Sequence, residues 1–363
     1  MRRAARRPVV QAQYEPGMLI ASGLSDGTLS ALGQRGYVIV ERHAQGQGRI
    51  LLKLRVPPGS SLEAARQELR AAEPRALVDL NHYYRPDSLE CSGRRCLMRQ
   101  ISGWPIGEGP AACRPTAPIG LIDTRINVKH PSLAASRITL LSLFDADIEP
   151  SGAHHGTAVA ALLVGQGAVP GLVQGSELVA IDAFRKGDVA TGFDLARAIE
   201  MLVARGVPVI NMSLSGPDNA ILAAIVAEAV ERNVLLVAAA GNDGPRAKPV
   251  YPAAYPGVIA VTAVDSGKNI YRRAARGAHV DIAAPGVNVW TAASVKGQRP
   301  RSGTSFAAPF VTAAAALILS ENPGFGRREV EIVLQNEAND LGDLGRDDVF
   351  GWGLLDVRRV CAG

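Results

Sequence analysis

Short apolar runs separated by polar turns fill the chain from about Gly17 to Tyr84. The runs predict four strands and two short helices, and Ser25 and Ser61 stand where they can cap the helices. The resulting order, βαββαβ, indicates a small α+β domain of the ferredoxin-like type. The expected strands lie at 18–22, 37–41, 50–56 and 76–80, and the expected helices at 26–32 and 62–69.

A different pattern begins at Pro118, where nearly continuous apolar runs alternate with helical segments. Continuous apolar runs are typical of strands that are buried on both faces of a parallel sheet. The alternation of strands and helices indicates a doubly wound α/β sheet, whose ligands bind at the carboxyl ends of its strands. The expected strands lie at 119–123, 178–183, 207–214, 234–240 and 258–264, and the expected helices at 191–205, at 219–233 and after Ser305.

The two patterns predict two domains, which suits a length of 363 residues. Residues 17–84 form the small α+β domain, and residues 117–363 form the α/β domain. Residues 85–116 show little periodicity and contain Pro and Gly, so we expect a linker there. The predicted fold class is α/β, with a doubly wound and mostly parallel sheet, preceded by a ferredoxin-like α+β domain.

Composition and charge exclude several classes of protein. The chain is 47% hydrophobic and 20% charged, as is usual for soluble globular proteins. No apolar run reaches the roughly 18 residues of a membrane span, and no basic stretch with interleaved aromatic residues indicates nucleic-acid binding. The densest basic cluster lies at residues 1–7, and no apolar segment of a secretion signal follows it. Residues 1–16 are therefore interpreted as a basic tail or a truncated leader, with a mis-chosen start as a third alternative.

The chain contains four cysteines, three of which fall within the linker. An even number in this layout favours an oxidising compartment, and hence a secreted or periplasmic protein. A zinc site is the weaker interpretation because only one close pair exists. Four free thiols in a cytosolic protein are the remaining alternative. The expected disulfides are Cys91–Cys96 and Cys113–Cys361.

Three polar residues stand where the chemistry of such a sheet is expected. Asp123 ends an apolar strand, whereas His155 and Ser305 each begin a helix. A serine hydroxyl is a poor nucleophile unless a base accepts its proton, and histidine can do so near neutral pH. A buried carboxylate would orient the imidazole, and the helix N-terminus at Ser305 would direct N–H groups at developing negative charge. Asn242 follows another buried strand, where its amide can donate to the same oxyanion.

The segments around these residues resemble the subtilase family of serine proteases, in that family's order of Asp, His and Ser. The resemblance covers about residues 117–358, and several spaced motifs in one order are far more specific than any one of them. The matching segments are Ile122-Asp-Thr124, His155-Gly-Thr-Ala-Val-Ala160, Asn211-Met-Ser-Leu214, Ala239-Ala-Gly-Asn-Asp-Gly244, Gly303-Thr-Ser-Phe-Ala-Ala-Pro309 and Gly351-Trp-Gly-Leu-Leu-Asp356.

The resemblance implies a role for each matching residue. Ser305 is expected to be the nucleophile, His155 the general base and then acid, and Asp123 the carboxylate that orients the imidazole. Asn242 and the backbone N–H of Ser305 are expected to form the oxyanion hole. The expected substrate-binding residues are Ser213, Leu214 and Ser215, which would pair with the substrate backbone, and Ala239, Ala240, Gly241 and Val250, which would line the specificity pocket.

The same resemblance gives the first domain the role of a prodomain, which assists folding of the enzyme and then inhibits it. Residues 78–84 would be the strand that occupies the active-site cleft, and residues 85–116 would be the processing region. We therefore expect a serine endopeptidase that is made as a self-processing zymogen. It would act on proteins or peptides as a monomer and need no cofactor.

Several features depart from the family pattern, among them Ala158, which replaces a common His and is interpreted as a packing change. Arg125 stands where the family usually has Gly, and a positive φ there would cost about 1–2 kcal/mol in strain. The loop at 165–171 is shorter than the family's calcium-binding loop and has no Asp or Asn, so we expect no metal. Val250 replaces a common Gly, and its extra carbons are expected to favour small or medium apolar residues at the P1 position of a substrate.

Two other functions compete with this hypothesis. A peptide-binding pseudoprotease would keep the cleft without turnover, but the intact set of Asp123, His155, Ser305 and Asn242 argues against it. A hydrolase of non-peptide esters on a similar sheet would need the G-x-S-x-G elbow, which Ser305-Phe-Ala307 lacks.

Overall fold

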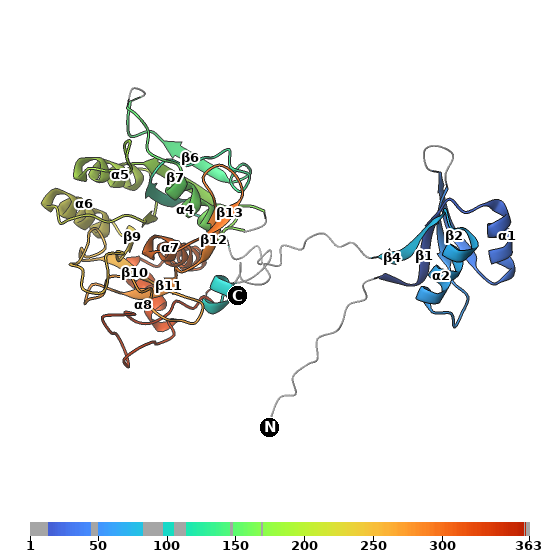
Figure 1. The fold of residues 1–363 in the computed structure, drawn as a ribbon. Helices are drawn as coiled ribbons and strands as arrows, with labels where there is room; N and C mark the ends of the chain where they lie inside the picture. The colour runs from blue at the N-terminus through green and yellow to red at the C-terminus, as the bar shows by residue number, and fades with distance from the viewer. Residues whose placement is uncertain are drawn as a thin grey trace. The chain divides into compact units, whose positions relative to one another are not determined.

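The chain divides into two compact units, Met1–Asp87 and Ser88–Gly363 (Figure 1). The computed structural model describes residues 14–44, 50–82, 97–104, 114–145, 148–167, 170–358 and 360. The basic residues at the start and much of the predicted linker lie outside the described residues. The disulfides predicted for Cys91, Cys96, Cys113 and Cys361 also lie outside them.

The N-terminal unit is a four-stranded antiparallel sheet with two helices. Its strands lie in the order β2-β3-β1-β4, and its elements follow the predicted sequence βαββαβ. Ser25 and Ser61 cap the helices, because their side chains accept hydrogen bonds from the backbone N–H groups of Thr28 (3.3 Å) and Ala64 (3.1 Å). The elements are β1 (Tyr14–Ser22), α1 (Asp26–Gln34), β2 (Val38–Ala44), β3 (Ile50–Arg55), α2 (Leu62–Ala72) and β4 (Leu77–His82).

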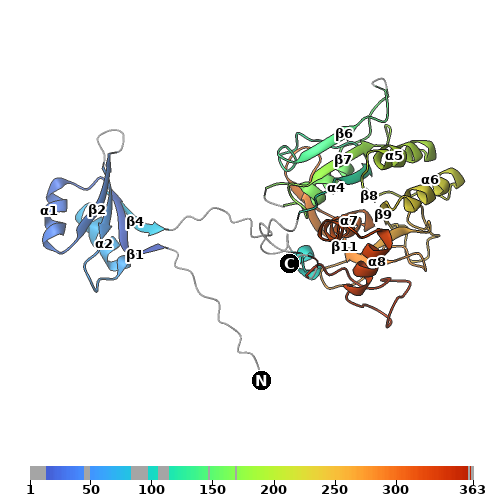
Figure 2. The ribbon, with the colours of Figure 1, turned by 180° about the vertical axis from the view of Figure 1, so that it is seen from behind.

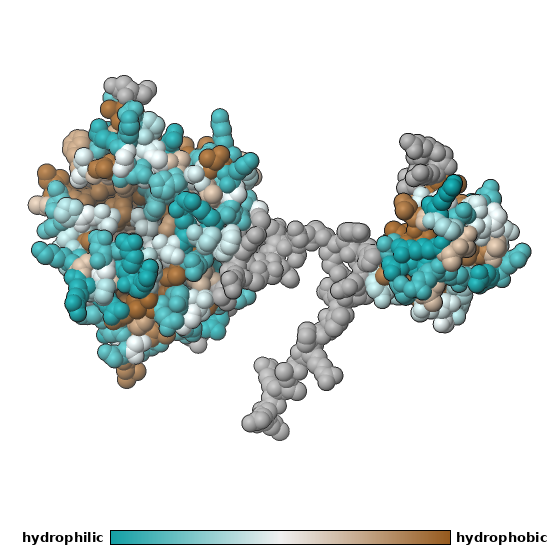
Figure 3. All heavy atoms as spheres, in the orientation of Figure 1, coloured by the Kyte–Doolittle hydropathy of each residue, from teal (hydrophilic) through white to brown (hydrophobic). Residues whose placement is uncertain are grey.

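The two faces of this small sheet differ. On the inner face, Leu19 and Leu52 are buried together with Leu69 of α2. On the outer face, Val38 is 50% exposed and Leu77 is 71% exposed. Figure 3 shows hydrophobic residues scattered over surfaces that are mostly hydrophilic.

The second unit is built on a seven-stranded sheet in which neighbouring strands are parallel, in the order β11-β10-β9-β8-β5-β7-β6. Helices α4, α7 and α8 pack on one face, and α5 and α6 pack on the other, as a doubly wound α/β fold requires (Figure 1 and, from behind, Figure 2). The elements are α3 (Leu97–Ile101), β5 (Ile119–Asp123), β6 (Arg137–Leu141), α4 (His154–Val164), β7 (Glu177–Asp182), α5 (Gly192–Ala204), β8 (Val209–Met212), α6 (Ala220–Glu231), β9 (Leu235–Ala239), β10 (Val258–Val264), β11 (Ile282–Pro285), β12 (Val289–Ala292), β13 (Gln298–Arg301), α7 (Thr304–Glu321) and α8 (Arg327–Asn336).

The hydrophobic pattern did not indicate several of these elements. β6 is an edge strand whose residues are partly or fully exposed, and β11 has only four residues. β13 pairs with β12 as a hairpin although its sequence, Gln-Arg-Pro-Arg, is largely polar. The strand predicted at 207–214 is shorter than expected and ends at Met212. This early end matters for function, because residues 213–215 then lie beyond the paired part of the strand.

Helix α7 is a core helix that begins at the carboxyl edge of the sheet. It is the one helix in the described part of the chain that is long and apolar enough to cross a membrane, but 78% of that stretch is buried inside the unit. At the carboxyl edge of the sheet, β5 ends at Asp123, β8 ends at Met212 and β9 ends at Ala239. These three strands are neighbours, so their ends meet beside the N-terminus of α7.

Candidate active site

A hydrogen bond joins Asp123 to His155. The Nδ1 atom of His155 lies 2.7 Å from Oδ1 of Asp123. Asp123 is 2% exposed at the end of β5, and His155 is the second residue of α4. The other oxygen of Asp123, Oδ2, is buried and accepts no hydrogen bond from the described residues. The buried carboxylate therefore orients the imidazole through Nδ1 and leaves Nε2 on the opposite side of the ring.

A close approach of α4 to the end of β5 holds this pair together. The backbone N–H of Gly156 donates to Oγ1 of Thr124 (2.9 Å). A Cβ atom at Gly156 would lie 2.1 Å from the carbonyl oxygen of Thr124, a distance that real side chains do not reach. Only glycine therefore allows the first turn of α4 to lie this close to the strand.

The pKa of His155 is raised above its ordinary value. Burial by itself lowers this pKa, but the negative charge and the hydrogen bond of Asp123 together outweigh burial. Asp188 raises the pKa further, whereas the positive charge of Arg301 lowers it. The site therefore stabilises the imidazolium that forms when His155 takes up a proton.

Ser305 is the second residue of α7, and its neighbour packs against the imidazole. The ring of Phe306 lies against the ring of His155, with 5.5 Å between their centroids. The carbonyl oxygen of Ser305 accepts a hydrogen bond from Oγ of Ser213 (2.8 Å), which ties the start of α7 to the end of β8. Ser213 is buried, whereas Ser305 is partly exposed. Of these two serines, Ser305 is therefore the one that a ligand can reach.

The amide of Asn242 is held in one orientation. Its Oδ1 accepts the backbone N–H of Thr304 (2.9 Å), and Oγ1 of Thr304 accepts the backbone N–H of Gly241 (3.2 Å). With Oδ1 engaged in this way, Nδ2 is the end of the amide that remains as a donor. Asn242 thus presents a hydrogen-bond donor beside the first turn of α7, where Ser305 lies.

Both segments predicted to bind substrate lie at this edge of the sheet. Residues 213–215 follow β8, and residues 239–241 span the end of β9, the neighbouring strand. The two segments are neighbours because the two strands lie side by side. Ser213, Ala239, Ala240 and Gly241 are buried, Leu214 is half-buried and Ser215 is exposed.

Val250 lies against the second of these segments. A Cβ atom at Gly241 would lie 2.9 Å from Cγ2 of Val250, so the valine side chain faces Gly241. Tyr251, the next residue, exchanges two backbone hydrogen bonds with Gly216 (2.8 and 2.9 Å). These bonds connect the chain that carries Val250 to the segment after β8.

The second unit matches a known family along almost its whole length. The model of the subtilase family matches residues 116–353. The chain belongs to the subtilase family. It is therefore a subtilisin-like serine endopeptidase, and both its fold class and its class of enzyme are those expected from the sequence.

Relatives of this subtilase include secreted and structurally known proteases. Subtilisin DY of Bacillus licheniformis is 36% identical over 66% of this chain and 88% of its own length. The minor extracellular protease Epr of Bacillus subtilis (strain 168) is 32% identical over 66% of this chain and 38% of its own length. The structure of the self-cleaved protease domain of PatA is 30% identical with a TM-score of 0.61, covering 68% of this chain and 96% of that domain.

The segment after Asp123 answers a question that the sequence left open for this subtilase. Arg125 does not adopt a positive φ, so the strain that such a φ would cause does not arise. Its backbone N–H instead donates to Oγ of Ser151 (2.8 Å), and Ser151 donates to the carboxylate of Asp182 (2.9 Å). The sequence reasoning did not single out Ser151 or Asp182. Asp182 carried a usable signal, because it ends an apolar strand just as Asp123 does.

We expect an NMR titration of His155, in the full-length chain carrying Ser305→Ala, to give a pKa above 6.5. Asp123→Asn should lower this pKa, because the variant loses the negative charge that outweighs burial. Arg301→Gln should raise it, because a neighbouring positive charge is removed. A pKa at or below 6.5 in the parent chain, or shifts of the same sign in both variants, would contradict this electrostatic account.

Proposed function

We propose that this subtilase cleaves peptide bonds with a catalytic triad of Asp123, His155 and Ser305. The proposal rests on the 2.7 Å hydrogen bond between Asp123 and His155, with Ser305 at the adjoining helix N-terminus. Nε2 of His155 accepts the hydroxyl proton of Ser305 as its Oγ attacks the scissile carbonyl carbon. The imidazolium then gives this proton to the leaving amine, and water hydrolyses the acyl-enzyme by the same route.

Asn242 and the backbone N–H of Ser305 are the proposed oxyanion hole. Charge that develops on the carbonyl oxygen is best stabilised by donors that are oriented before the reaction. Thr304 supports this role by holding Oδ1 of Asn242, which leaves Nδ2 to donate. The N–H of Ser305 belongs to the first turn of α7, where backbone N–H groups have no partner within the helix.

A serine-directed fluorophosphonate should label the mature enzyme at Ser305 alone, and Ser305→Ala should abolish both labelling and nearly all turnover. Asn242→Ala should lower kcat by about 10²–10³, or roughly 2.7–4 kcal/mol of transition-state stabilisation, a magnitude taken from the oxyanion-hole asparagine of subtilisin itself. A loss below about tenfold would place the oxyanion hole elsewhere. A mature protein that is not labelled would favour a peptide-binding pseudoprotease instead.

We propose that substrate binds as an added strand along residues 213–215, with its P1 side chain beside residues 239–241. Two observations support this placement. The backbone of residues 213–215 lies beyond the last ladder pair of β8, and the end of β9 forms the adjacent wall. Val250, which faces Gly241, would then limit the depth of the P1 pocket.

Val250→Gly should shift the ratio of kcat/KM toward substrates with Phe or Tyr at P1, relative to those with Ala or Val. Each methylene that no longer fits is worth roughly 1–3 kcal/mol, so the shift should reach about tenfold or more. Val295→Gly is the matched control, because Val295 is 71% exposed in the hairpin loop. An unchanged ratio in Val250→Gly, or a parent enzyme that already prefers Phe, would remove Val250 from the pocket.

The N-terminal unit is proposed to be a prodomain that inhibits the enzyme until the chain cleaves itself. Its last strand ends at His82, directly before the predicted processing region. Its outer sheet face carries exposed Val38 and Leu77, which a partner surface would cover. Self-cleavage is also named for the similar protease domain of PatA.

The parent chain should therefore cut itself between about residues 85 and 112, whereas purified Ser305→Ala should remain at full length. Intact-mass measurement over time follows both chains, and the N-terminal sequence of the product gives the cleavage position. Adding a small amount of mature enzyme to Ser305→Ala should restore cleavage, which shows that the variant is still a substrate. Equally fast cleavage of isolated Ser305→Ala would exclude self-processing.

The compartment, oligomeric state and disulfides of the enzyme are also proposals. We propose a secreted or periplasmic monomer, in keeping with the relative named as an extracellular protease. The disulfides Cys91–Cys96 and Cys113–Cys361 belong to this proposal. The absence of a metal from the loop at 165–171 stays a prediction as well, because residues 168 and 169 lie outside the described part of the chain.

A further inference from the structure

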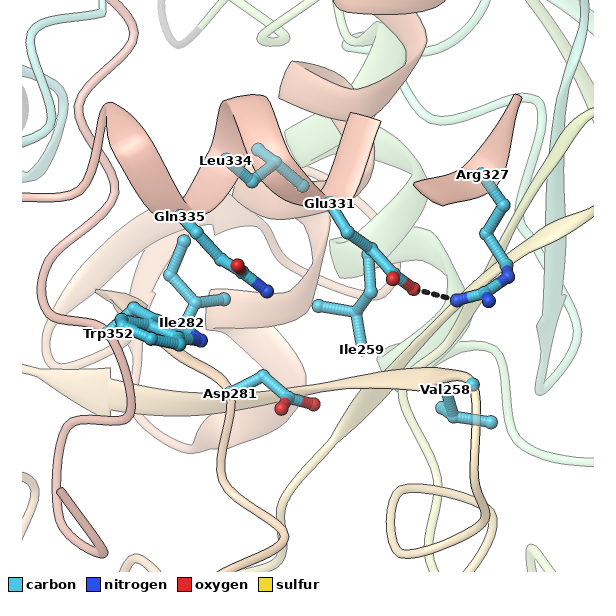
Figure 4. Close-up of a pocket in the computed structure, with 10 residues that line it drawn as sticks. Val258, Ile259, Asp281, Ile282, Arg327, Glu331, Leu334, Gln335 and Trp352 are labelled. Atoms are coloured by element: carbon cyan, nitrogen blue, oxygen red, sulfur yellow. Dashed lines mark hydrogen bonds and ion pairs between the residues drawn. The ribbon is translucent and has the colours of Figure 1, made fainter. Parts of the chain in front are cut away.

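A separate pocket lies at the opposite edge of the sheet from the proposed triad. Its floor is formed where β10 and β11 begin, whereas the triad lies where strands end. Helix α8 borders one side and Trp352 lies at one end (Figure 4). Its volume of about 280 Å³ suits a small ligand or a single side chain.

One indole ring and several aliphatic side chains form the apolar part of this pocket. Ile259 comes from β10 and Leu334 from α8, and Trp352 remains 37% exposed. The backbone N–H of Trp352 donates to the carbonyl oxygen of Asp281 (2.8 Å). A Cβ atom at the preceding Gly351 would lie 2.1 Å from the same oxygen, so this glycine permits the contact. The backbone that carries the indole is therefore fixed in place.

Two carboxylates reach the pocket from different elements. Glu331 projects from α8 and Asp281 precedes β11, so they lie on opposite sides (Figure 4). Oε1 of Glu331 is paired with Arg327, whereas Oε2 accepts no hydrogen bond from the described residues. Oδ2 of Asp281 accepts the N–H of Ala260 (2.9 Å), and Oδ1 lies 3.3 Å from Arg346. Both carboxylates therefore keep spare capacity to accept hydrogen bonds.

The arginines beside the two carboxylates do not fully offset the cost of burying their negative charges. Burial raises the pKa of Asp281 and the pKa of Glu331, although each has an arginine partner. The charge of Asp281 adds to the rise at Glu331, which means that the two groups repel each other. Across the described residues, no three His, Cys, Asp or Glu side chains converge, so a hard metal ion would lack ligands. An organic cation would relieve the repulsion without needing a full coordination shell.

We propose that this pocket binds a guanidinium group carried on an apolar stem, either a small molecule or the side chain of an arginine in another polypeptide. A planar guanidinium can donate to Oε2 of Glu331 and Oδ1 of Asp281 with two of its nitrogens and stack on the indole of Trp352. Leu334 and Ile259 contact the stem. A compact ammonium has no flat face for the indole, so the guanidinium is preferred. The inference does not depend on the roles proposed for the triad.

The test follows the indole Nε1–H signal of Trp352 by NMR in the full-length chain carrying Ser305→Ala, with Trp352→Phe to assign the signal. Millimolar propylguanidinium should shift this signal to saturation. Propylurea has nearly the same shape but no charge, and it should give no saturable shift. Acetyl-argininamide distinguishes the sources: binding like that of propylguanidinium identifies a polypeptide arginine, and failure to bind identifies a small molecule.

Glu331→Gln should weaken propylguanidinium binding about tenfold or more, because it removes a charge-assisted hydrogen bond. Glu200→Gln removes an exposed carboxylate from α5 and should leave binding unchanged. An equal effect of propylurea, no saturable shift, or an unchanged affinity in Glu331→Gln would overturn the proposal. The comparison of propylguanidinium with propylurea needs no substitution in the pocket, so it decides the question even where a variant fails to fold.

Discussion

The whole site depends on one close approach, between the first turn of α4 and the end of β5. The strand is fixed by ladders to β7 and β8 on its two sides, so the position of Asp123 follows from the sheet. His155 has no such ladder, and its position follows from the contact of Gly156 with Thr124. A side chain at position 156 would meet the carbonyl of Thr124 at 2.1 Å and push the helix away. A shift of about 1 Å is enough to break a hydrogen bond. The orientation of the imidazole therefore depends on the absence of a Cβ atom at Gly156.

The nucleophile is positioned by a different force, the burial of a whole helix. α7 is buried along most of its length, which fixes its axis against the sheet through hydrophobic packing. Three hydrogen bonds then fix its first turn: Ser213 to Ser305, Gly241 to Thr304, and Thr304 to Asn242. Their partners come from the ends of β8 and β9, the strands that lead into the segments proposed to bind substrate. The groups proposed to attack, to stabilise charge and to hold substrate are thus connected before any substrate binds, which is what preorganisation requires.

The hydrophobic pattern predicted the bounds of strands that are buried along their whole length, and it missed strands that are exposed or polar. The strands predicted at 119–123 and 258–264 have the predicted bounds, because both are buried throughout and read as unbroken apolar runs. β6 and β13 were missed because an exposed edge strand and a polar hairpin strand have no such run.

In the site, the proximity of Asp123 and His155 could be anticipated from motifs and strand ends. The contribution of Thr304 to the orientation of Asn242 could not, because a backbone donor in the first turn of a helix has no sequence signature. The pocket at Trp352 was also beyond prediction, since its carboxylates are 50 residues apart and nothing local relates them.

Asp182 explains why the loop after Asp123 tolerates Arg125. The sheet register pairs Asp123 directly with Asp182 on β7, which brings a second carboxylate beside the first. Burial raises the pKa of Asp182 and the charge of Asp123 adds to this effect, whereas hydrogen bonds from Ser151 and from the N–H of Phe184 lower it. Ser151 also accepts the N–H of Arg125. One buried hydroxyl therefore solvates the second carboxylate and holds the loop in ordinary backbone geometry. The loop keeps its shape through this hydrogen bond, so it does not need a glycine.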